Sequence, residues 1–267
     1  MSTMEDIFGR SGSLIGVVHL PPLPGSSGWD GDMPRVVGRA LDDAAALQAA
    51  GFDGIILENF GDAPFSGGFA GRGPVAAMAA VGALVAVKTS LPLGINVLRS
   101  DALSAVAVAA AVGARFIRVN VHIGAAATDQ GIIQGNARET LLAIREVAPR
   151  LRVFADVFVK HARPLGSEDI EQAAVELVER GKAAAVIVTG DMTGSPGSAE
   201  ELARVRAAVP ETPIIAGSGV TAETVADVLG RCDAVIVGSC IMEEGRAAHP
   251  IDPARAALFV RAARAEQ

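Results

Sequence analysis

Several features that this chain lacks narrow its class. No apolar run reaches the ~18–20 residues of a membrane span without a charge, a glycine or a proline. The first residues hold no cationic segment followed by an apolar one, so we expect no signal peptide and a cytoplasmic location. Cys232 and Cys240 are the only cysteines and lack metal-site spacing, which predicts two reduced thiols. There is no basic run and the net charge is −7, so nucleic-acid binding is disfavoured.

Apolar residues, in contrast, are abundant. They make up 50% of the 267 residues, against 20% for charged residues, which is ample for a sizeable core. An α/β barrel typically takes about 250 residues as a single domain. No linker or shift in composition divides the sequence, so residues 1–267 are predicted to form one domain.

Short apolar runs alternate eight times with longer helical stretches. The runs are nearly continuous in apolar residues, which is typical of parallel strands that are buried on both faces. The predicted strands are 14–19, 54–59, 92–98, 115–122, 151–160, 184–189, 213–217 and 234–238. The predicted helices are 35–50, one ending at 88, 101–112, one ending at 147, one ending near 181 with Ser167 as N-cap, 199–209, one capped by Thr221, and 252–264.

Eight such units predict a (β/α)8 TIM barrel. A doubly wound open sheet is the alternative, but it would carry a glycine fingerprint after its first strand. The segment after the first predicted strand, residues 19–28, is rich in proline and has no GxGxxG pattern. The barrel is therefore the preferred fold.

The fifth predicted strand places a carboxylate inside a run of valine and phenylalanine. An ionised Asp156 among such neighbours is costly unless it is paired or hydrogen-bonded. Strand alternation puts Asp156 and Lys160, one of only three lysines, on the same face and His161 on the opposite one. We expect Asp156 and Lys160 to face a ligand at the barrel axis, with a buried structural salt bridge as the alternative.

In a barrel the carboxyl ends of the strands carry the chemistry. The candidate catalytic residues there are Glu58, Asn96, Asn120, His122, Asp156 and Lys160. The candidate substrate contacts at the same ends are His19, Arg118 and Thr189. Alternation predicts that Arg118, Asn120 and His122 all face inward, which favours a ligand-filled mouth over a dry core. A structural ion pair between Glu58 and Arg118 or Lys160, and ordinary loop hydrogen bonds for His19 and Asn96, are the alternatives.

Two turns of small residues end the seventh and eighth predicted strands. They contain the candidate phosphate-binding residues Gly217, Ser218, Gly219, Gly238 and Ser239. Barrels often bind a phosphate here through backbone N–H groups and a short extra helix, for which residues 240–244 are the candidate. The alternative is that the glycines serve only the tight turns.

Three long loops, residues 20–32, 59–73 and 124–135, follow the first, second and fourth predicted strands. Loops of this length in a compact domain are usually functional. Asp62 and Asp129 are candidate polar contacts from these loops.

Long segments of the chain resemble the signature segments of the BtpA/SgcQ family. The resemblance spans about Ile7 to Val260. Its segments are 15–25, 54–65, 96–101, 117–122, 154–161, 188–190 and 217–220. It implies a TIM-barrel-like fold, but it gives almost no indication of which reaction the protein catalyses. One member of the family is associated with photosystem I biogenesis at thylakoid membranes, and others belong to sugar-metabolism gene clusters.

The leading hypothesis is an enzyme acting on a small phosphorylated substrate, a sugar phosphate or a nucleotide derivative. Asp156 or Glu58 would be the general acid/base, with Lys160 as an electrostatic stabiliser or a Schiff-base nucleophile. Glycosyl-bond hydrolysis or transfer, isomerisation and lyase chemistry all remain open.

Two further expectations concern cofactors and partners. No cofactor is required by the sequence, although a divalent metal held by Glu58, Asp156 and a histidine is a variant. The alternative from another class is a non-catalytic assembly factor on the same barrel, which the family association supports. Self-association into a homo-oligomer is expected because barrels commonly associate.

Overall fold

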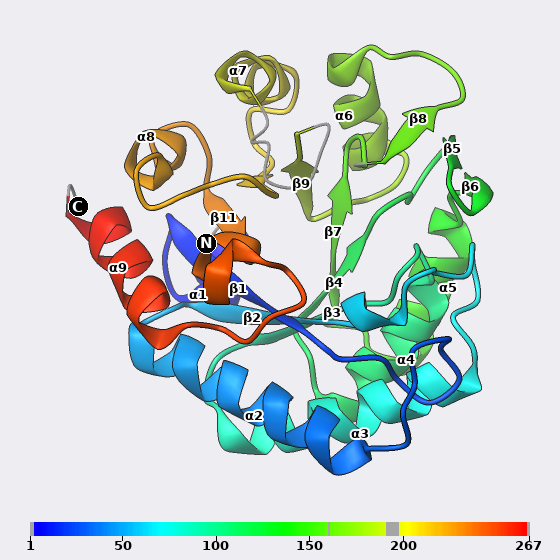
Figure 1. The fold of residues 1–267 in the computed structure, drawn as a ribbon. Coiled ribbons are helices and arrows are strands. Elements are labelled where there is room, and N and C mark those ends of the chain that lie inside the picture. Colours follow the sequence, from blue (N-terminus) through cyan, green and yellow to red (C-terminus); the bar gives the residue numbers. More distant parts are fainter. Residues whose placement is uncertain (1–2, 160, 191–197, 266–267) are drawn as a thin grey trace.

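Eight parallel strands close into a barrel in the computed structural model, which describes residues 3–159, 161–190 and 198–265. The strands follow one another around the ring in the order β1-β2-β3-β4-β7-β9-β10-β11 (Figure 1). Their bounds are β1 (Ser13–His19), β2 (Gly54–Glu58), β3 (Leu93–Asn96), β4 (Phe116–Val119), β7 (Arg152–Asp156), β9 (Ala185–Val188), β10 (Ile214–Ala216) and β11 (Ala234–Val237). The predicted (β/α)8 TIM barrel is confirmed.

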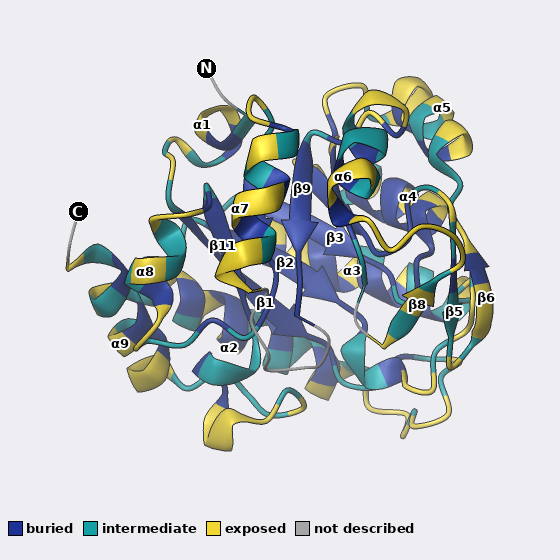
Figure 2. Cartoon of the chain, turned by 90° about the horizontal axis from the view of Figure 1, so that it is seen from above, coloured by how far each residue is buried: buried dark blue, intermediate teal, exposed yellow. Residues whose placement is uncertain are grey.

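Helices alternate with these strands and form the outer layer. They are α2 (Met33–Ala50), α3 (Arg72–Lys88), α4 (Ala102–Val112), α5 (Ala137–Val147), α6 (Ile170–Glu179), α7 (Ala199–Ala208), α8 (Val225–Leu229) and α9 (Pro253–Arg264). Figure 2 shows the strands buried at the centre, with the exposed faces of the helices turned outward. Within the described ranges, no helix has both the length and the hydropathy to cross a membrane.

Apolar side chains fill the barrel interior beneath the mouth, toward the amino-terminal ends of the strands. Phe116 and Phe154 stack with their ring centroids 4.6 Å apart, and Phe8 meets Phe116 edge-on at 5.6 Å. Phe8 comes from α1 (Thr3–Phe8), a short helix that the sequence pattern did not predict and that packs against the interior cluster. The polar side chains of the mouth therefore lie above a dry apolar layer.

Two predicted strands end earlier than expected. β4 ends at Val119 rather than at 122, and β7 ends at Asp156 rather than at 160. Beyond β4 the backbone forms hydrogen bonds with a side chain and not with a neighbouring strand. Val121 N donates to Ser100 Oγ at 3.0 Å, and Ser100 Oγ donates to the carbonyl oxygen of Val121 at 3.1 Å.

A second, three-stranded antiparallel sheet lies in the loops after these two strands. It consists of β5 (Ala125–Thr128), β6 (Gly131–Gln134) and β8 (Ala162–Pro164), in the order β6-β5-β8. Figure 2 shows it at one side of the barrel. From the sequence these segments were expected to be loop, since runs such as Ala125–Thr128 carry little β-propensity.

Some helix caps also differ from the prediction. Asp169, not Ser167, is the N-cap of α6, and its Oδ1 accepts from Glu171 N at 3.0 Å. Thr224 precedes α8, and Thr221 opens the turn before it. The expected helix at residues 240–244 is instead two 3-10 turns, η2 (Ser239–Ile241) and η3 (Glu243–Gly245).

Gly94 provides a test of the interior packing. A Cβ at this position in β3 would overlap the ring of Phe116, which occupies the space above the glycine. Gly94→Ala is expected to lower the free energy of unfolding by about 1–3 kcal/mol, because overpacking displaces the aromatic layer. Urea denaturation measures this change.

Gly38→Ala in α2 is the matched control. A Cβ at Gly38 would meet no atom within 4 Å, so alanine is expected to raise the free energy of unfolding by about 0.5–1 kcal/mol. Equal effects of the two substitutions would contradict the packing assigned to Gly94.

Candidate active site

A cavity of about 560 Å³ opens at the carboxyl ends of the barrel strands. Most of the predicted site residues line it. They are His19, Glu58, Asn96, Arg118, Asn120, Gly217, Ser218, Gly219, Gly238 and Ser239. Lys160, predicted as a catalytic residue, lies outside the described residues. The parallel strands thus bring together side chains that are up to about two hundred residues apart in the sequence.

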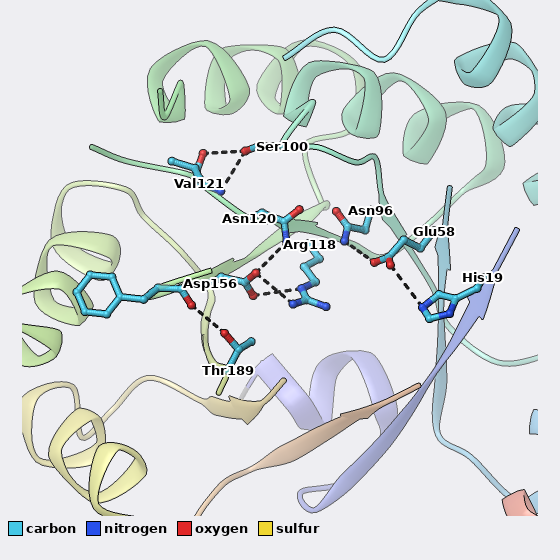
Figure 3. Close-up of polar contacts among 10 residues, drawn as sticks. His19, Glu58, Asn96, Ser100, Arg118, Asn120, Val121, Asp156 and Thr189 are labelled. Carbon is cyan, nitrogen blue, oxygen red and sulfur yellow. Dashed lines mark hydrogen bonds and ion pairs between the residues drawn. The ribbon is translucent and has the colours of Figure 1, made fainter. Parts of the chain in front are cut away.

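Asp156 is paired with two residues of the neighbouring chain segment (Figure 3). Its Oδ1 accepts from Arg118 Nε at 3.1 Å, and its Oδ2 accepts from Arg118 Nη2 at 3.1 Å. Asn120 Nδ2 adds a third hydrogen bond to Oδ2 at 2.8 Å. The side chains of Asp156 and Arg118 are 0% and 10% exposed. This bidentate pair offsets the free-energy cost of burying the Asp156 charge. It corresponds to the alternative given for Asp156 above, a buried structural salt bridge.

Burial alone lowers the pKa of the Arg118 guanidinium. The carboxylates of Asp156 and Glu58 outweigh that effect and raise the pKa above its ordinary value. Arg118 therefore stays charged. Since all three hydrogen bonds to Asp156 keep its oxygens occupied, the geometry favours Asp156 as a group that positions Arg118 and Asn120 over Asp156 as a proton carrier.

Glu58 stands in a different environment, at the ends of β1, β2 and β3. Its Oε2 accepts from Asn96 Nδ2 at 2.6 Å, and its Oε1 lies 3.4 Å from His19 Nε2. The other ring nitrogen of His19, Nδ1, lies 2.7 Å from the carbonyl oxygen of Ala247. Phe60 stacks on the His19 ring with a centroid distance of 4.3 Å, which further fixes the ring.

These contacts fix which atoms of the pair face each other. A carbonyl oxygen only accepts, so His19 Nδ1 donates to Ala247 and Nε2 is the ring nitrogen that faces Glu58. Burial raises the pKa of Glu58, but hydrogen bonds and charges from His19, Arg118 and Asn96 outweigh burial and hold the pKa below its ordinary value. The arrangement is thus a buried carboxylate held against a histidine ring that Ala247 keeps in place.

The cavity also contains residues that sequence reasoning missed or misplaced. Arg99, 7% exposed, follows β3, and its Nη1 lies 3.7 Å from Asp129 Oδ1. Burial lowers the pKa of Arg99, opposed by carboxylates that include Asp129. The available signal was the family-like segment 96–101, which contains Arg99. Phe60 and Phe65 line the cavity as well.

His161 was expected to face away from the mouth, and that expectation is wrong. It lines the cavity, because β7 ends at Asp156 and strand alternation no longer applies five residues later. His161 has a φ of 53°, so the chain turns there. Of the loop carboxylates, Asp129 lines the cavity, whereas Asp62 accepts from Leu23 N at 2.7 Å and ties two loops together.

The prediction that His122 faces inward is also wrong. Its ring is fully buried, and Nε2 donates to the carbonyl oxygen of Gly181 at 2.8 Å, next to the end of α6. Because β4 ends at Val119, the alternation that fixes Arg118 does not reach His122. His122 lines a second cavity of about 270 Å³ beside α6, which Asn120 and Asp156 also line. Burial lowers its pKa, with the Gly181 hydrogen bond acting in the opposite sense.

Thr189 does not line the mouth cavity either. Its Oγ1 donates to the carbonyl oxygen of Phe158 at 2.8 Å. The hydroxyl thereby ties the end of β9 to the loop after β7 and is occupied within the protein.

The glycines of the two turns differ in what requires them. A Cβ at Gly217 would lie 2.5 Å from side-chain atoms of Ile187 and Thr189, so packing excludes a side chain. Gly219 has a φ of 71°, where a side chain is strained. A Cβ at Gly238 would meet only His19, at 3.6 Å and 3.9 Å, which is ordinary contact. Packing therefore requires glycine at position 217 and backbone conformation requires it at position 219, whereas packing does not require it at position 238.

No metal donor set is present among the described residues. They contain no group of three or more histidine, cysteine, aspartate or glutamate side chains placed to hold an ion. In the metal variant considered above, Asp156 is already committed to Arg118 and Asn120. Both cysteines are free thiols, as predicted, and burial raises the pKa of Cys232 to about 11 and that of Cys240 to about 12.

Comparison with known proteins places the chain among its relatives. The family model described as "BtpA family" matches residues 10–265. "Photosystem I biogenesis protein BtpA" of Synechocystis sp. is 44% identical over 96% of this chain and 89% of its own length. "Putative sgc region protein SgcQ" of Escherichia coli is 29% identical over 97% of each chain. The resemblance to BtpA and SgcQ is thus confirmed.

A solved structure, that of N-(5'-phosphoribosyl)anthranilate isomerase from Pyrococcus furiosus, matches with a TM-score of 0.57. The two sequences are 15% identical, and the match covers 95% of this chain and 99% of the isomerase. At this identity the likeness shows the shared fold alone.

Removing one partner of the buried ion pair tests its importance for stability. Asp156→Ala leaves the Arg118 charge without its bidentate partner, so the free energy of unfolding is expected to fall by about 3–5 kcal/mol. The double variant Arg118→Met, Asp156→Leu removes both charges and is expected to regain most of that loss. Urea denaturation measures both effects.

Arg204→Ala is the control for the ion pair. Arg204 pairs with Glu171 on the surface, where both side chains are about half exposed, so its loss is expected to leave the denaturation midpoint within error. A double variant as unstable as Asp156→Ala would contradict the assigned role of the pair.

His122 predicts a pH dependence of stability. Its folded pKa lies below the ordinary value of 6.5, so the unfolded chain binds the proton first as pH falls. The contribution of neutral His122 to the free energy of unfolding is fully present above about pH 6.5. On acidification below that pH, this contribution falls by up to about 1.4 kcal/mol per pH unit. His122→Gln, which can still donate to Gly181, is expected to lose less stability between about pH 7.5 and 5.5. Urea midpoints at the two pH values measure this, and His249→Gln should behave as wild type. Identical pH dependence in His122→Gln and wild type would refute the assignment.

Proposed function

The chain belongs to the BtpA family, and on that premise we propose that it is an enzyme that binds a small phosphorylated substrate at the barrel mouth. The reaction proceeds by proton transfer to and from the His19–Glu58 pair. One observation carries this proposal: a buried pair of a histidine and a carboxylate, His19 and Glu58, faces an open cavity.

The pair has the properties that acid/base catalysis needs. Asn96 holds Glu58 and Ala247 holds His19, so neither group has to be ordered when substrate binds. The Arg118 charge nearby favours the ionised form of Glu58. His19 then acts as the acid and Glu58 as the base, with roles that exchange as the proton moves.

The proposed phosphate position lies across the mouth from β3 and β4. The turns at Gly217–Gly219 and Gly238–Ser239 line the same cavity as the cationic side chain of Arg99 and the ring of His161. Gly238 supports this position, because protein packing leaves room for a side chain there and glycine lets a ligand approach the backbone closely. The 3-10 turn of η2 stands where a short helix was predicted and takes no part in the proposal.

The reaction class stays open within this proposal. One acid and one base suit isomerisation, glycosyl-bond hydrolysis or transfer, and lyase chemistry equally. The isomerase from Pyrococcus furiosus is named for a phosphoribosyl substrate, but its likeness to this chain concerns the fold. The name of the Synechocystis relative favours the second candidate, an assembly factor that uses the barrel as a scaffold. Self-association stays a prediction in both cases.

Ligand-induced stabilisation separates the two candidates. The melting temperature of the protein is measured with inorganic phosphate and with a panel of sugar phosphates at millimolar concentration. A ligand at a hundred times its Kd stabilises the fold by about 2.7 kcal/mol, so a rise is expected. Gly238→Ala is expected to reduce the rise and to leave the unliganded melting temperature unchanged. Absence of any response to every anion would favour the assembly factor.

Glu58→Gln tests the acid/base role. For a panel compound that is turned over, kcat is expected to fall about 10²–10⁴-fold, because the pair loses its base while the Asn96 contact can be kept. Binding should change little. Product formation followed by NMR measures turnover, and Glu243→Gln on the exposed η3 turn is the control. Full activity in Glu58→Gln would exclude the pair as the catalytic base.

A further inference from the structure

Two asparagines in the cavity wall are held in a fixed orientation. Asn96 Nδ2 donates to Glu58 at 2.6 Å, and Asn120 Nδ2 donates to Asp156 at 2.8 Å. A carboxylate oxygen only accepts, so neither amide can be flipped without losing its hydrogen bond. In both residues Oδ1 is therefore the free end of the amide, and it is an acceptor.

Neither acceptor has a partner within the part of the chain that the structure describes. Asn96 and Asn120 are 1% and 5% exposed, and both Oδ1 atoms are buried without a hydrogen bond. Buried polar atoms are nearly always satisfied, and an exception calls for an explanation such as a ligand. Both residues line the mouth cavity, and Asn120 also lines the smaller cavity beside α6, so a group seated in the mouth is adjacent to both residues.

The two acceptors come from neighbouring strand ends. Ile95 of β3 pairs with Ile117 of β4, Asn96 is the last residue of β3, and Asn120 directly follows β4. Figure 3 shows the two amide oxygens turned to the same side, away from the carboxylates that hold the nitrogens. The wall therefore presents two neighbouring acceptors.

Local charge decides what kind of donor fits. An ammonium group would share the cavity with the Arg118 guanidinium, and like charges repel. The carboxylates that could offset it, Glu58 and Asp156, are already paired. Neutral hydroxyl groups donate without adding charge, and two adjacent hydroxyls match two adjacent acceptors.

We propose that Asn96 Oδ1 and Asn120 Oδ1 accept hydrogen bonds from two neighbouring hydroxyl groups of the substrate, which makes the substrate a phosphorylated sugar or polyol. This inference rests on the proposed function and specifies the substrate class of the same site. In the eight-strand ring, β3 and β4 stand four strands from β10 and β11, on opposite sides of the mouth.

That placement orients the substrate. Its phosphate lies at the turns after β10 and β11, and its hydroxyl groups lie against β3 and β4. The His19–Glu58 pair on β1 and β2 stands between these two sides in the ring. The reacting atoms are therefore in the middle of the substrate, between the phosphate and the recognised hydroxyls. A cavity of about 560 Å³ has the size of a small-molecule site.

The test compares matched ligands on the wild-type protein. Dissociation constants are measured by calorimetry for inorganic phosphate, for three- to six-carbon sugar and polyol phosphates, and for analogues of each lacking one hydroxyl. The best hydroxylated compound is expected to bind at least tenfold more tightly than one of its deoxy analogues and than inorganic phosphate, because the missing hydroxyl leaves a buried acceptor unpaired.

Two variants locate the effect. Asn120→Ala is expected to abolish the preference for the hydroxylated compound while leaving the affinity for inorganic phosphate within about twofold. Gly238→Ala is expected to weaken inorganic phosphate and the sugar phosphate alike. Circular dichroism of each variant establishes that it is folded, and the wild-type ligand comparison stands without either variant.

The outcomes separate the inference from the function on which it rests. If deoxy analogues bind as tightly as their parents, or if a liganded crystal structure retains water on both amide oxygens, the hydroxyl recognition is wrong and the phosphate site stands. The hydroxyl recognition is equally wrong if inorganic phosphate binds and no sugar or polyol phosphate binds more tightly. If no phosphate-bearing compound binds, both the inference and the proposed function fail.

Discussion

The buried ion pair between Arg118 and Asp156 is the interaction on which the polar mouth depends. Inside a barrel, charge survives only when it is compensated, and the bidentate contact between these neighbouring strands provides that compensation. The same carboxylate orients Asn120, and the same guanidinium lowers the pKa of Glu58. Glu58 in turn faces His19. Carboxylates on β7 and β2 therefore share the Arg118 guanidinium as a favourable charge.

The apolar layer beneath the mouth makes this arrangement effective. Phe116 and Phe154 stack two residues before Arg118 and Asp156 on the same strands, so the ion pair lies directly above two aromatic rings. Little water reaches it from below, and electrostatic interactions strengthen in such surroundings. Gly94 on β3 completes the layer by leaving space for the Phe116 ring.

Sequence reasoning succeeded where strand alternation holds and failed where it stops. The inward positions of Glu58 and Asn96 follow from a period of two within a strand, and both residues line the mouth cavity. Asp156 was expected to face a ligand there, but it is bonded to Arg118 and Asn120 and lines the cavity beside α6. His122 and His161 were misplaced because the strands end three and five residues before them, respectively, which no apolar pattern reveals.

The hydrogen-bond partners of these side chains were harder to predict than the side of the strand on which each side chain lies. A pattern gives the face of Asp156 but not its partner, and the ion pair considered as an alternative for Glu58 was with Arg118 or Lys160, whereas its contacts are with His19 and Asn96. Such pairings depend on register between strands far apart in sequence. They also decide the chemistry, because Asp156 is held by three hydrogen bonds whereas Glu58 faces a histidine ring. Stability alone is a weak reason for this polar mouth, since well-packed apolar residues often replace a buried ion pair without loss. The arrangement is better explained by what the cavity binds: every charge in the Arg118–Asp156 and His19–Glu58 pairs is compensated, and the unsatisfied atoms of Asn96 and Asn120 are acceptors in the wall of that cavity.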